Sequence, residues 1–238
     1  MTRLRIDHRT IFRPPASQGR LIQLLRMTPD DTHDQSIARW DVHPDCDARM
    51  RAGRDGFGNR MTMLYLTAPA REIEIIVTGE VLTAASNGVV RGASEPLPPA
   101  LFLRRATATD EELAGWARGV TSGATSMLDR LHRVNVAIRR EAAGGVPRFL
   151  AAARSLSIPA RFVSGYSSAL DRDADRAVPH AWAEAHVEGL GWVAFDPATG
   201  LSADEAYVRV AVALDAVGAA PVAGRTPGSG EGDPPAEQ

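Results

Sequence analysis

The stretch His180–Val187, HAWAEAHV, and the stretch Trp192–Asp196, WVAFD, decide how this chain folds. Successive side chains of an extended strand point to opposite faces of a sheet. The first stretch therefore puts His, Trp, Glu and His on one face and Ala, Ala, Ala and Val on the other. The second puts Trp, Ala and Asp on one face, opposite Val and Phe. This alternation predicts an antiparallel pair of strands with one apolar, buried side.

The loop between these strands fixes their register. A loop with an odd number of residues pairs Val187 with Gly191 and Trp182 with Asp196, which brings the two small or apolar faces together as a buried side requires. Asp196 then lies diagonal to His180, at roughly 7–8 Å between backbone positions and within side-chain reach. A loop with an even number would flip one strand and break both matches. The sequence therefore predicts a contact between His180 and Asp196.

A His–Asp contact has a chemical use. A carboxylate bonded to one ring nitrogen fixes the tautomer of the histidine and leaves the other nitrogen to take or give a proton. The usual third member is a thiol or hydroxyl at a helix N-terminus, where the dipole favours a thiolate. His–Asp pairs are also often structural, so the residue types alone do not establish catalysis.

The first third of the chain has the pattern of β-structure. Residues Arg3–Phe12 alternate as in a half-buried strand. Four further short runs of strand character follow: Leu21–Met27, Ile37–Val42, Met61–Leu66 and Glu72–Leu82. Gly53–Asn59 is a strong turn signal between them. The spacing predicts a sandwich or compact barrel over residues 1–90, with a connector at Asn87–Pro99.

Helical patterns come next. Thr109 and Glu112 fit a capping box that opens a helix. Met127–Arg140 carries apolar residues at helical spacing, with Arg and Asp on the opposite face. Pro147 suits the first position of a third helix, which we expect to end near Ser157.

After the helices the pattern returns to β-structure. Arg161–Tyr166 is a predicted strand, and Leu170–Pro179 is a predicted polar loop. Ala206–Leu214 is apolar, and its pattern fits a strand or a helix equally well. Residues 223–238 are rich in Gly, Pro, Ser and Glu, so we expect a disordered tail there.

The hairpin also resembles a known family. HAWAE followed by GWVAFDP resembles the His and Asp segments of the transglutaminase-like superfamily, whose core is papain-like. LSIPARFVSGY (Leu156–Tyr166) is similar to the segment after the central helix of that family, and FGNR (Phe57–Arg60) to the β-domain before the core in its bacterial branch. The resemblance implies an α+β fold: an N-terminal β-sandwich-like domain, then a papain-like transglutaminase core over residues 100–222. It implies that His180 and Asp196 are the catalytic His and Asp of a cysteine protease, amidase or acyltransferase.

The nucleophile of the family is missing. The family places its Cys at the start of the central helix, in a segment like G-V-C, whereas this chain has Gly145-Val146-Pro147. Counting back without gaps from Arg154 puts the nucleophile on Ala142, and matching the G-V puts it on Pro147. Neither side chain can attack a carbonyl, and the segment before this helix looks shorter than in the family. The triad is incomplete by sequence.

Other nucleophiles are poor substitutes. Cys46 is the only cysteine, and the two aspartates beside it would raise the pKa of its thiol. Three serines follow the third helix, but no pattern pairs them with His180: Ser164, Ser167 and Ser168.

The sequence gives no indication of a metal or another cofactor. His43 and Cys46 lack a second pair of ligands at suitable spacing. His180 and His186 lie roughly 20 Å apart along one strand, too far to share an ion. We expect Trp182 and Trp192 to be packing residues in preference to residues that bind substrate. We expect His186 to lie at the surface, at the end of its strand.

The composition limits the classes of binding partner that we expect. With 27 basic and 29 acidic residues the formal net charge is −2, which gives no reason to expect nucleic acid or an anionic membrane. No apolar run approaches the roughly 20 residues of a spanning helix, and the N-terminus lacks the pattern of a secretory signal. A single cysteine excludes intrachain disulfides, so a cytoplasmic location is the simplest expectation.

Three functional hypotheses follow. In the first, the chain is a non-catalytic relative that binds a peptide or protein in the former cleft. In the second, it is an active amide hydrolase or acyltransferase with a substitute nucleophile within about 3 Å of the His180 ring. In the third, the true gene product is longer, contains the Cys segment and is an ordinary cysteine amidase or protease. We favour the first; the sequence does not give the substrate or the oligomeric state.

Overall fold

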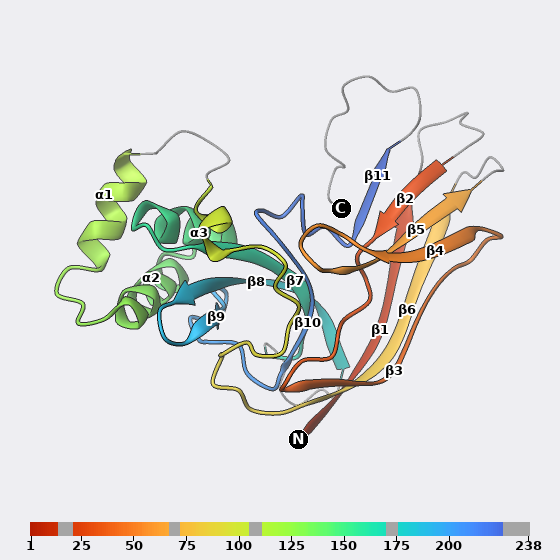
Figure 1. Cartoon of the computed structure of the whole chain (residues 1–238), viewed down its shortest axis with the longest axis horizontal. Helices are drawn as coiled ribbons and strands as arrows, with labels where there is room; N and C mark the ends of the chain where they lie inside the picture. The colour runs from red at the N-terminus through yellow and green to blue at the C-terminus, as the bar shows by residue number, and fades with distance from the viewer. Residues whose placement is uncertain (14–20, 67–71, 105–110, 170–175, 226–238) are drawn as a thin grey trace.

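A computed structural model of the whole chain gives the arrangement of its elements (Figure 1). The structure describes residues 1–13, 21–66, 72–104, 111–169 and 176–225. Within these ranges the helices gather at one end of the molecule and a sandwich of strands forms the other end. The described part is therefore an α+β protein, as predicted.

The N-terminal strands agree with the sequence pattern, with one exception. They are β1 (Thr2–Phe12), β2 (Leu21–Leu25), β3 (Gln35–Pro44), β4 (Arg49–Arg54), β5 (Arg60–Leu66) and β6 (Ile73–Thr83). The pattern missed β4, because its sequence RMRAGR has no apolar alternation and most of its residues are exposed. Residues Asp55–Asn59 form the predicted turn between β4 and β5.

The second half contains three α-helices and five strands within the described ranges. They follow the 3-10 helix η1 (Pro99–Leu103) and are α1 (Glu111–Val120), α2 (Met127–Glu141), α3 (Gly145–Ser155), β7 (Ala160–Ser167), β8 (Arg176–Val187), β9 (Gly191–Phe195), β10 (Tyr207–Ala213) and β11 (Val222–Arg225). Ser126 caps α2 by accepting the Asp129 N–H at 3.1 Å. Thr109, the predicted cap of α1, lies outside the described residues. None of the described helices is long and apolar enough to cross a membrane.

Two sheets connect the halves of the chain. One has the order β10-β7-β8-β1-β6-β3, with β9 also paired to β8, and the other has the order β11-β2-β5-β4. The link in the first sheet is a short parallel pairing of Ile6 in β1 with Ala177 in β8. The predicted β-domain and the predicted core therefore share one continuous sheet.

Three local predictions need correction or completion. Pro147 is the third residue of α3, not the first, because Gly144 caps the helix in a left-handed conformation with φ 76°. Val178 and Pro179 belong to β8, where they pair with β7, and not to a loop. The apolar stretch that fitted either element is strand β10.

The predicted disorder of the tail is wrong for residues 223–225. They belong to β11, which pairs antiparallel with β2, so Val222 lies opposite Leu25. The pairing supplies backbone hydrogen bonds that a composition rich in Gly and Pro does not reveal. The remainder of the predicted tail lies outside the described residues.

The apolar core divides between the two ends. At one end α2 and α3 pack on the alanine face of β8, with Phe149 and Phe195 stacked at 5.3 Å. At the other end the two sheets enclose a second cluster, to which β7 contributes Tyr166 and β10 contributes Val208. Burial of apolar side chains on both faces of β7, β8 and β10 fixes the position of the hairpin.

Candidate functional site

The β8–β9 hairpin has the predicted register. Val187 lies opposite Gly191, and Ala183 lies opposite Phe195, at the end of the paired region. The next position along each strand sets Trp182 opposite Asp196. The odd loop, Glu188–Leu190, thus directs His180 and Asp196 to the same face.

His180 and Asp196 are in direct contact. His180 Nε2 donates to Asp196 Oδ2 at 2.9 Å. The Asp196 side chain is fully buried, whereas that of His180 is 15% exposed. The predicted contact is therefore present, and the ring of its histidine is within reach of solvent. The catalytic role assigned to the two residues from the resemblance stays a prediction.

Asp196 is held by more than the histidine. The Tyr207 hydroxyl donates to the same Oδ2 at 2.7 Å, and the Ala198 N–H donates to Oδ1 at 2.8 Å. Burial alone would raise the pKa of the Asp196 carboxyl, but the hydrogen bonds from His180 and Tyr207 and the nearby ring charge lower it overall. Burial and the Asp196 charge raise the pKa of the Tyr207 hydroxyl, so that group stays a donor. The site is an ionised carboxylate with both oxygens bonded.

Tyr207 was missed by sequence reasoning. It lies on β10, which pairs with β7 and not with the hairpin, so no spacing along the hairpin points to it. The only signal is a Tyr at the start of an apolar stretch whose secondary structure the pattern left open.

Aromatic rings fix the orientation of the histidine. Trp182 stacks beside the His180 ring, with centroids 6.3 Å apart, and Tyr207 meets Trp182 edge-on at 5.3 Å. Gly165 lies opposite His180 on β7, and a Cβ there would come within 2.7 Å of Trp182 Cη2. Trp182 and Trp192 are buried, which confirms the expectation that they pack.

The two candidate positions for the nucleophile lie at the α2–α3 junction. Ala142 is the C-cap of α2, in a left-handed conformation with φ 50°, and Pro147 lies within α3. Only residues 142–144 separate the two helices. Glu141 closes this turn by accepting the Trp116 indole N–H at 2.9 Å and pairing with Arg148 at 2.7 Å. Arg148 also lies 4.1 Å above the Trp116 ring.

No substitute nucleophile is bonded to the histidine in the described part of the chain. The Ser164 hydroxyl donates to the Ala219 carbonyl at 2.7 Å, and the Ser167 hydroxyl accepts the Ala169 N–H at 2.9 Å. Within the same ranges, His180 Nδ1 makes no hydrogen bond with any side chain or backbone group. That nitrogen is the one through which the ring can meet a ligand.

Cys46 is a residue of the N-terminal half. It packs partly buried against the cluster between the two sheets. Burial raises the pKa of its thiol, and the charges of Asp45 and Asp47 raise it further. The direction agrees with the expectation from sequence and disfavours the thiolate. Among the described residues, no three His, Cys, Asp or Glu side chains are grouped as a metal site requires.

Two family models match the chain. Residues 4–82 match the bacterial transglutaminase-like N-terminal region, and residues 147–197 match the transglutaminase-like superfamily, a segment that contains both His180 and Asp196. The chain belongs to the transglutaminase-like superfamily. The match to the core begins at Pro147, after the position of Ala142.

Known relatives extend the comparison over the whole chain. This transglutaminase-like protein is similar to the uncharacterized protein ML0607 of Mycobacterium leprae (strain TN), with 26% identity over 98% of this chain and 96% of that protein. Its fold is similar to a crystal structure of a candidate cysteine protease from Cytophaga hutchinsonii, with a TM-score of 0.71, 16% identity, and coverage of 94% of this chain and 85% of that one. The periplasmic domain of TgpA from Pseudomonas aeruginosa is less similar, with a TM-score of 0.37, 14% identity, and coverage of 82% and 76%.

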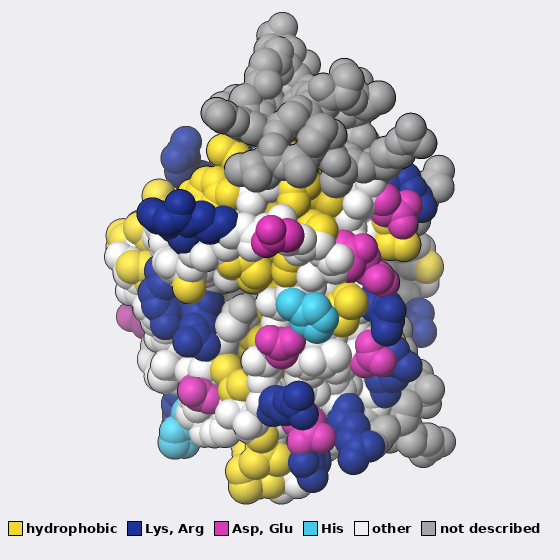
Figure 2. Space-filling model, turned by 90° about the vertical axis from the view of Figure 1, so that its right-hand side faces the viewer, with side chains coloured by type: hydrophobic (Ala, Val, Ile, Leu, Met, Phe, Trp, Pro, Cys, Tyr) yellow, Lys and Arg dark blue, Asp and Glu magenta, His cyan; other side chains and the backbone are white. Residues whose placement is uncertain are grey.

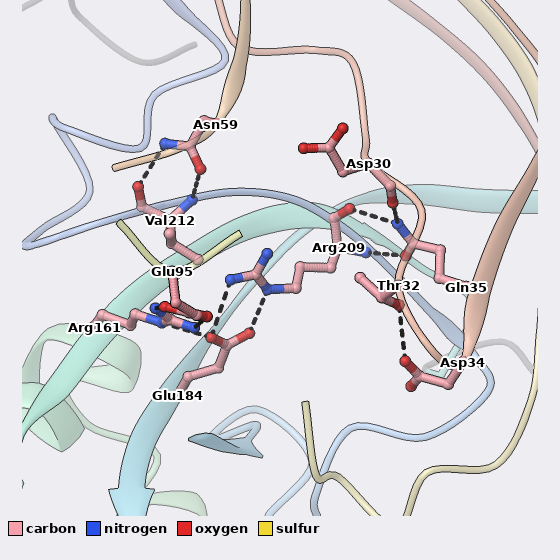
Figure 3. A network of polar contacts seen from close by, with 10 residues as sticks. All are labelled: Asp30, Thr32, Asp34, Gln35, Asn59, Glu95, Arg161, Glu184, Arg209 and Val212. Carbon is pink, nitrogen blue, oxygen red and sulfur yellow. Dashed lines mark hydrogen bonds and ion pairs between the residues drawn. The ribbon is translucent and has the colours of Figure 1, made fainter. Parts of the chain in front are cut away.

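The glutamate of the HAWAE motif lies in a buried ion cluster (Figure 3). Glu184 accepts from Arg161 Nε and from Arg209 Nε, each at 2.7 Å. Arg161 also donates to both carboxylate oxygens of Glu95 in the connector, at 2.6 and 2.7 Å. Burial alone would raise the pKa of the Glu184 carboxyl, but the two guanidinium groups lower it overall. The cluster joins the connector to β7, β8 and β10.

Two amide side chains join the N-terminal half to β10 (Figure 3). Asn59, from the FGNR motif, donates to the Val212 carbonyl at 2.7 Å and accepts the Val212 N–H at 2.8 Å. Gln35 does the same with the backbone of Arg209, at 3.0 and 2.8 Å. Each side-chain amide bonds to both the N–H and the carbonyl of one β10 residue, as a neighbouring strand would. β10 is also the strand that supplies Tyr207. The N-terminal half thus supports the carboxylate of the site indirectly.

Proposed function

We propose that this chain is a non-catalytic transglutaminase-like protein that binds a peptide or protein segment beside His180. The observation that carries the proposal is that the His180–Asp196 pair is fully built while no described thiol or hydroxyl bonds to the ring. An ionised Asp196 fixes the hydrogen on Nε2, and Nδ1 is left to accept a hydrogen bond from a donor such as a peptide N–H. A cytoplasmic setting is part of the proposal, because a single cysteine suits a reducing compartment.

The histidine alone does not supply acyl transfer. Covalent catalysis requires a nucleophile within hydrogen-bond reach of the base. A thiol at Ala142 would lie at the C-terminus of α2, where the helix dipole disfavours a thiolate. The Arg148, Glu141 and Trp116 contacts hold this short turn in place without a nucleophile.

The test compares turnover with binding. Full-length protein is incubated with casein and a fluorescent primary amine, and separately with a fluorogenic peptide mixture, next to the variants His180→Ala and Cys46→Ser. We expect no product above the His180→Ala background in either assay. Turnover that His180→Ala abolishes and Cys46→Ser leaves unchanged would overturn the proposal in favour of a substitute nucleophile.

A second candidate is the longer, active gene product. The alignment with the M. leprae protein runs over 279 residues, whereas this chain has 238, so at least 41 aligned positions have no counterpart here. The family match that starts at Pro147 is compatible with a loss before α3. Sequencing the source DNA across the codons for Arg139–Arg148 decides this. An additional Cys-bearing segment in frame would make the protein a cysteine amidase or protease candidate.

A further inference from the structure

A groove in the N-terminal half lies between β3 and β4. In the sheet order, β1 and β6 separate β3 from β8, the strand that carries His180. Two sheet edges flank it: β3 ends one sheet and β4 ends the other. No described residue pairs with the outer edge of either strand. The groove has a volume of about 420 Å³, within the range of about 300–1,000 Å³ that is usual for ligand pockets.

The floor of this groove is apolar and rigid. Trp40 and Met61 line it, from β3 and β5 respectively. Trp40 lies flat against Gly79, where a Cβ would come within 2.3 Å of the indole, and its Nε1 donates to the Met27 carbonyl at 2.9 Å. Such a floor accepts apolar side chains without rearrangement.

The rim of the groove is basic. Arg39 and Arg60 line it together with Ala52 and Gly53 of β4, and β4 carries three further exposed arginines outside the lining: Arg49, Arg51 and Arg54. Arg54 and Arg60 pair with Asp30. By contrast, Arg49 and Arg51 make no ion pair with any residue in the described ranges. Figure 2 shows the face of the molecule on the side of the N-terminal strands, with dark-blue basic side chains interspersed with magenta acidic ones.

The charge pattern distinguishes among the possible occupants. Free sheet edges recruit extended chains through backbone hydrogen bonds, with side chains alternating between the two faces. A second copy adding antiparallel through β4 would set arginine against arginine in the registers that pair Arg49 with Arg51 or with Arg54, and like charges opposite each other destabilise a pair. Arginines on an edge therefore prevent self-association but complement an acidic strand.

We propose that the free edge of β4, which carries Arg49 and Arg51 beside the groove, binds an acidic extended segment of a partner polypeptide by strand addition. In this arrangement alternate acidic side chains of the segment lie on the face that carries Arg49 and Arg51, and the intervening apolar ones lie on the opposite face, which carries Ala52. The surface is separate from the proposed ligand site at His180, so either one stands without the other.

The test uses labelled peptides and full-length protein. A fluorescein-labelled peptide that alternates Glu or Asp with Val is titrated by fluorescence anisotropy, beside a peptide of the same length with Lys in place of the acids. We expect binding of the acidic peptide alone, weakened by added NaCl because exposed charges are screened. The double variant Arg49→Glu with Arg51→Glu should bind the acidic peptide at least tenfold more weakly than the wild type. The neutral double variant Arg49→Gln with Arg51→Gln should have an affinity between these two.

Matched controls separate this site from general charge and from misfolding. Arg118 and Arg130 are exposed arginines on α1 and α2, so Arg118→Glu with Arg130→Glu makes the same change in net charge and should leave binding unchanged. Thermal unfolding followed by circular dichroism confirms that each variant is folded.

Hydrogen exchange tests the strand addition itself. The backbone amides of Arg49–Arg54 should exchange more slowly when the acidic peptide is added. The Lys peptide should not change their exchange. Equal binding of both peptides, or an unchanged affinity of the Arg49→Glu and Arg51→Glu variant, would overturn the proposal. Equally tight binding of a single-stranded DNA oligonucleotide would also overturn it, since that outcome indicates a general polyanion surface.

Discussion

The β8–β9 hairpin and the α2–α3 junction belong to the same transglutaminase-like core but differ in what they retain. The hairpin keeps a His and an Asp in contact at 2.9 Å, with Tyr207 bonded to the same carboxylate. The junction has Ala142 and Pro147 where the resemblance puts the nucleophile, in a turn closed by Glu141 and Arg148.

The difference teaches that structural contacts alone can hold a buried His–Asp pair in place. Asp196 is the acceptor for a buried tyrosine, and Trp182 packs beside both rings. Removing any one of these groups leaves another without its partner. The position at the α2–α3 junction has no such ties, because the side chain of Ala142 is exposed. A substitution at this position is therefore expected to cost the fold little.

The largest effect is expected at the ion cluster beneath the hairpin. Glu184→Gln removes the charge that neutralises Arg161 and Arg209, and breaking one partner of a buried ion pair costs about 3–5 kcal/mol. We expect this loss in the free energy of unfolding by urea denaturation. Glu188→Gln, in the exposed loop of the same hairpin, is the matched control and should change it by less than about 0.5 kcal/mol. A loss as small as that of the control would mean that the cluster does not hold the hairpin.

Asp196→Asn is expected to have the next largest effect. It leaves His180 and Tyr207 facing a neutral amide, and hydrogen bonds to charged groups are worth about 1.5–3 kcal/mol. We expect the free energy of unfolding, measured by urea denaturation, to fall by about 2–3 kcal/mol. The Tyr207 hydroxyl is expected to lose its hydrogen bond to this side chain. Tyr207→Phe should lose less, since the carboxylate keeps the His180 and Ala198 contacts.

The same carboxylate predicts a dependence on pH. The pKa of Asp196 is lowered in the folded protein, so the unfolded chain binds the proton more readily. Its contribution to stability is present above its ordinary pKa of 3.8 and is lost as the pH falls through the folded value. Unfolding temperatures measured between neutral pH and pH 3 should therefore drop for the wild type and drop less for Asp196→Asn. Parallel curves would contradict the assignment of an ionised Asp196.

The contrast also explains what could be predicted from the sequence. Strand alternation and loop parity determine the hairpin register, so the contact between His180 and Asp196 was predictable from one local stretch. Tyr207, Gln35 and Asn59 bond to residues in segments that do not pair with their own segments, and no periodicity along a segment reports such a partner. β4 and β11 were missed because backbone pairing holds them, while their side chains show no apolar alternation.

At the junction, Arg148→Ala should have a smaller effect than either hairpin change. It removes the ion pair with Glu141 and the contact over Trp116, both of which are partly exposed. Exposed ion pairs contribute about 0.2–1 kcal/mol and exposed cation–π contacts about 0.5–1 kcal/mol. We expect a loss of about 1 kcal/mol in urea denaturation. Arg140→Ala, a neighbouring exposed arginine on α2, is the control. A loss above about 3 kcal/mol would show that the junction is as tightly built as the hairpin.

The smallest expected effect is a gain in stability, at Ala142 in the α2–α3 junction. Ala142 caps α2 with φ 50°, a backbone conformation that costs an L-residue energy and costs glycine almost none. Ala142→Gly should therefore stabilise the protein by about 0.5–1 kcal/mol, measured as a higher urea midpoint with an unchanged slope. Ala143→Gly, at a neighbour without positive φ, should not stabilise and serves as the control. A lower urea midpoint for Ala142→Gly would mean that the Ala142 methyl group makes a stabilising contact, although its side chain is exposed.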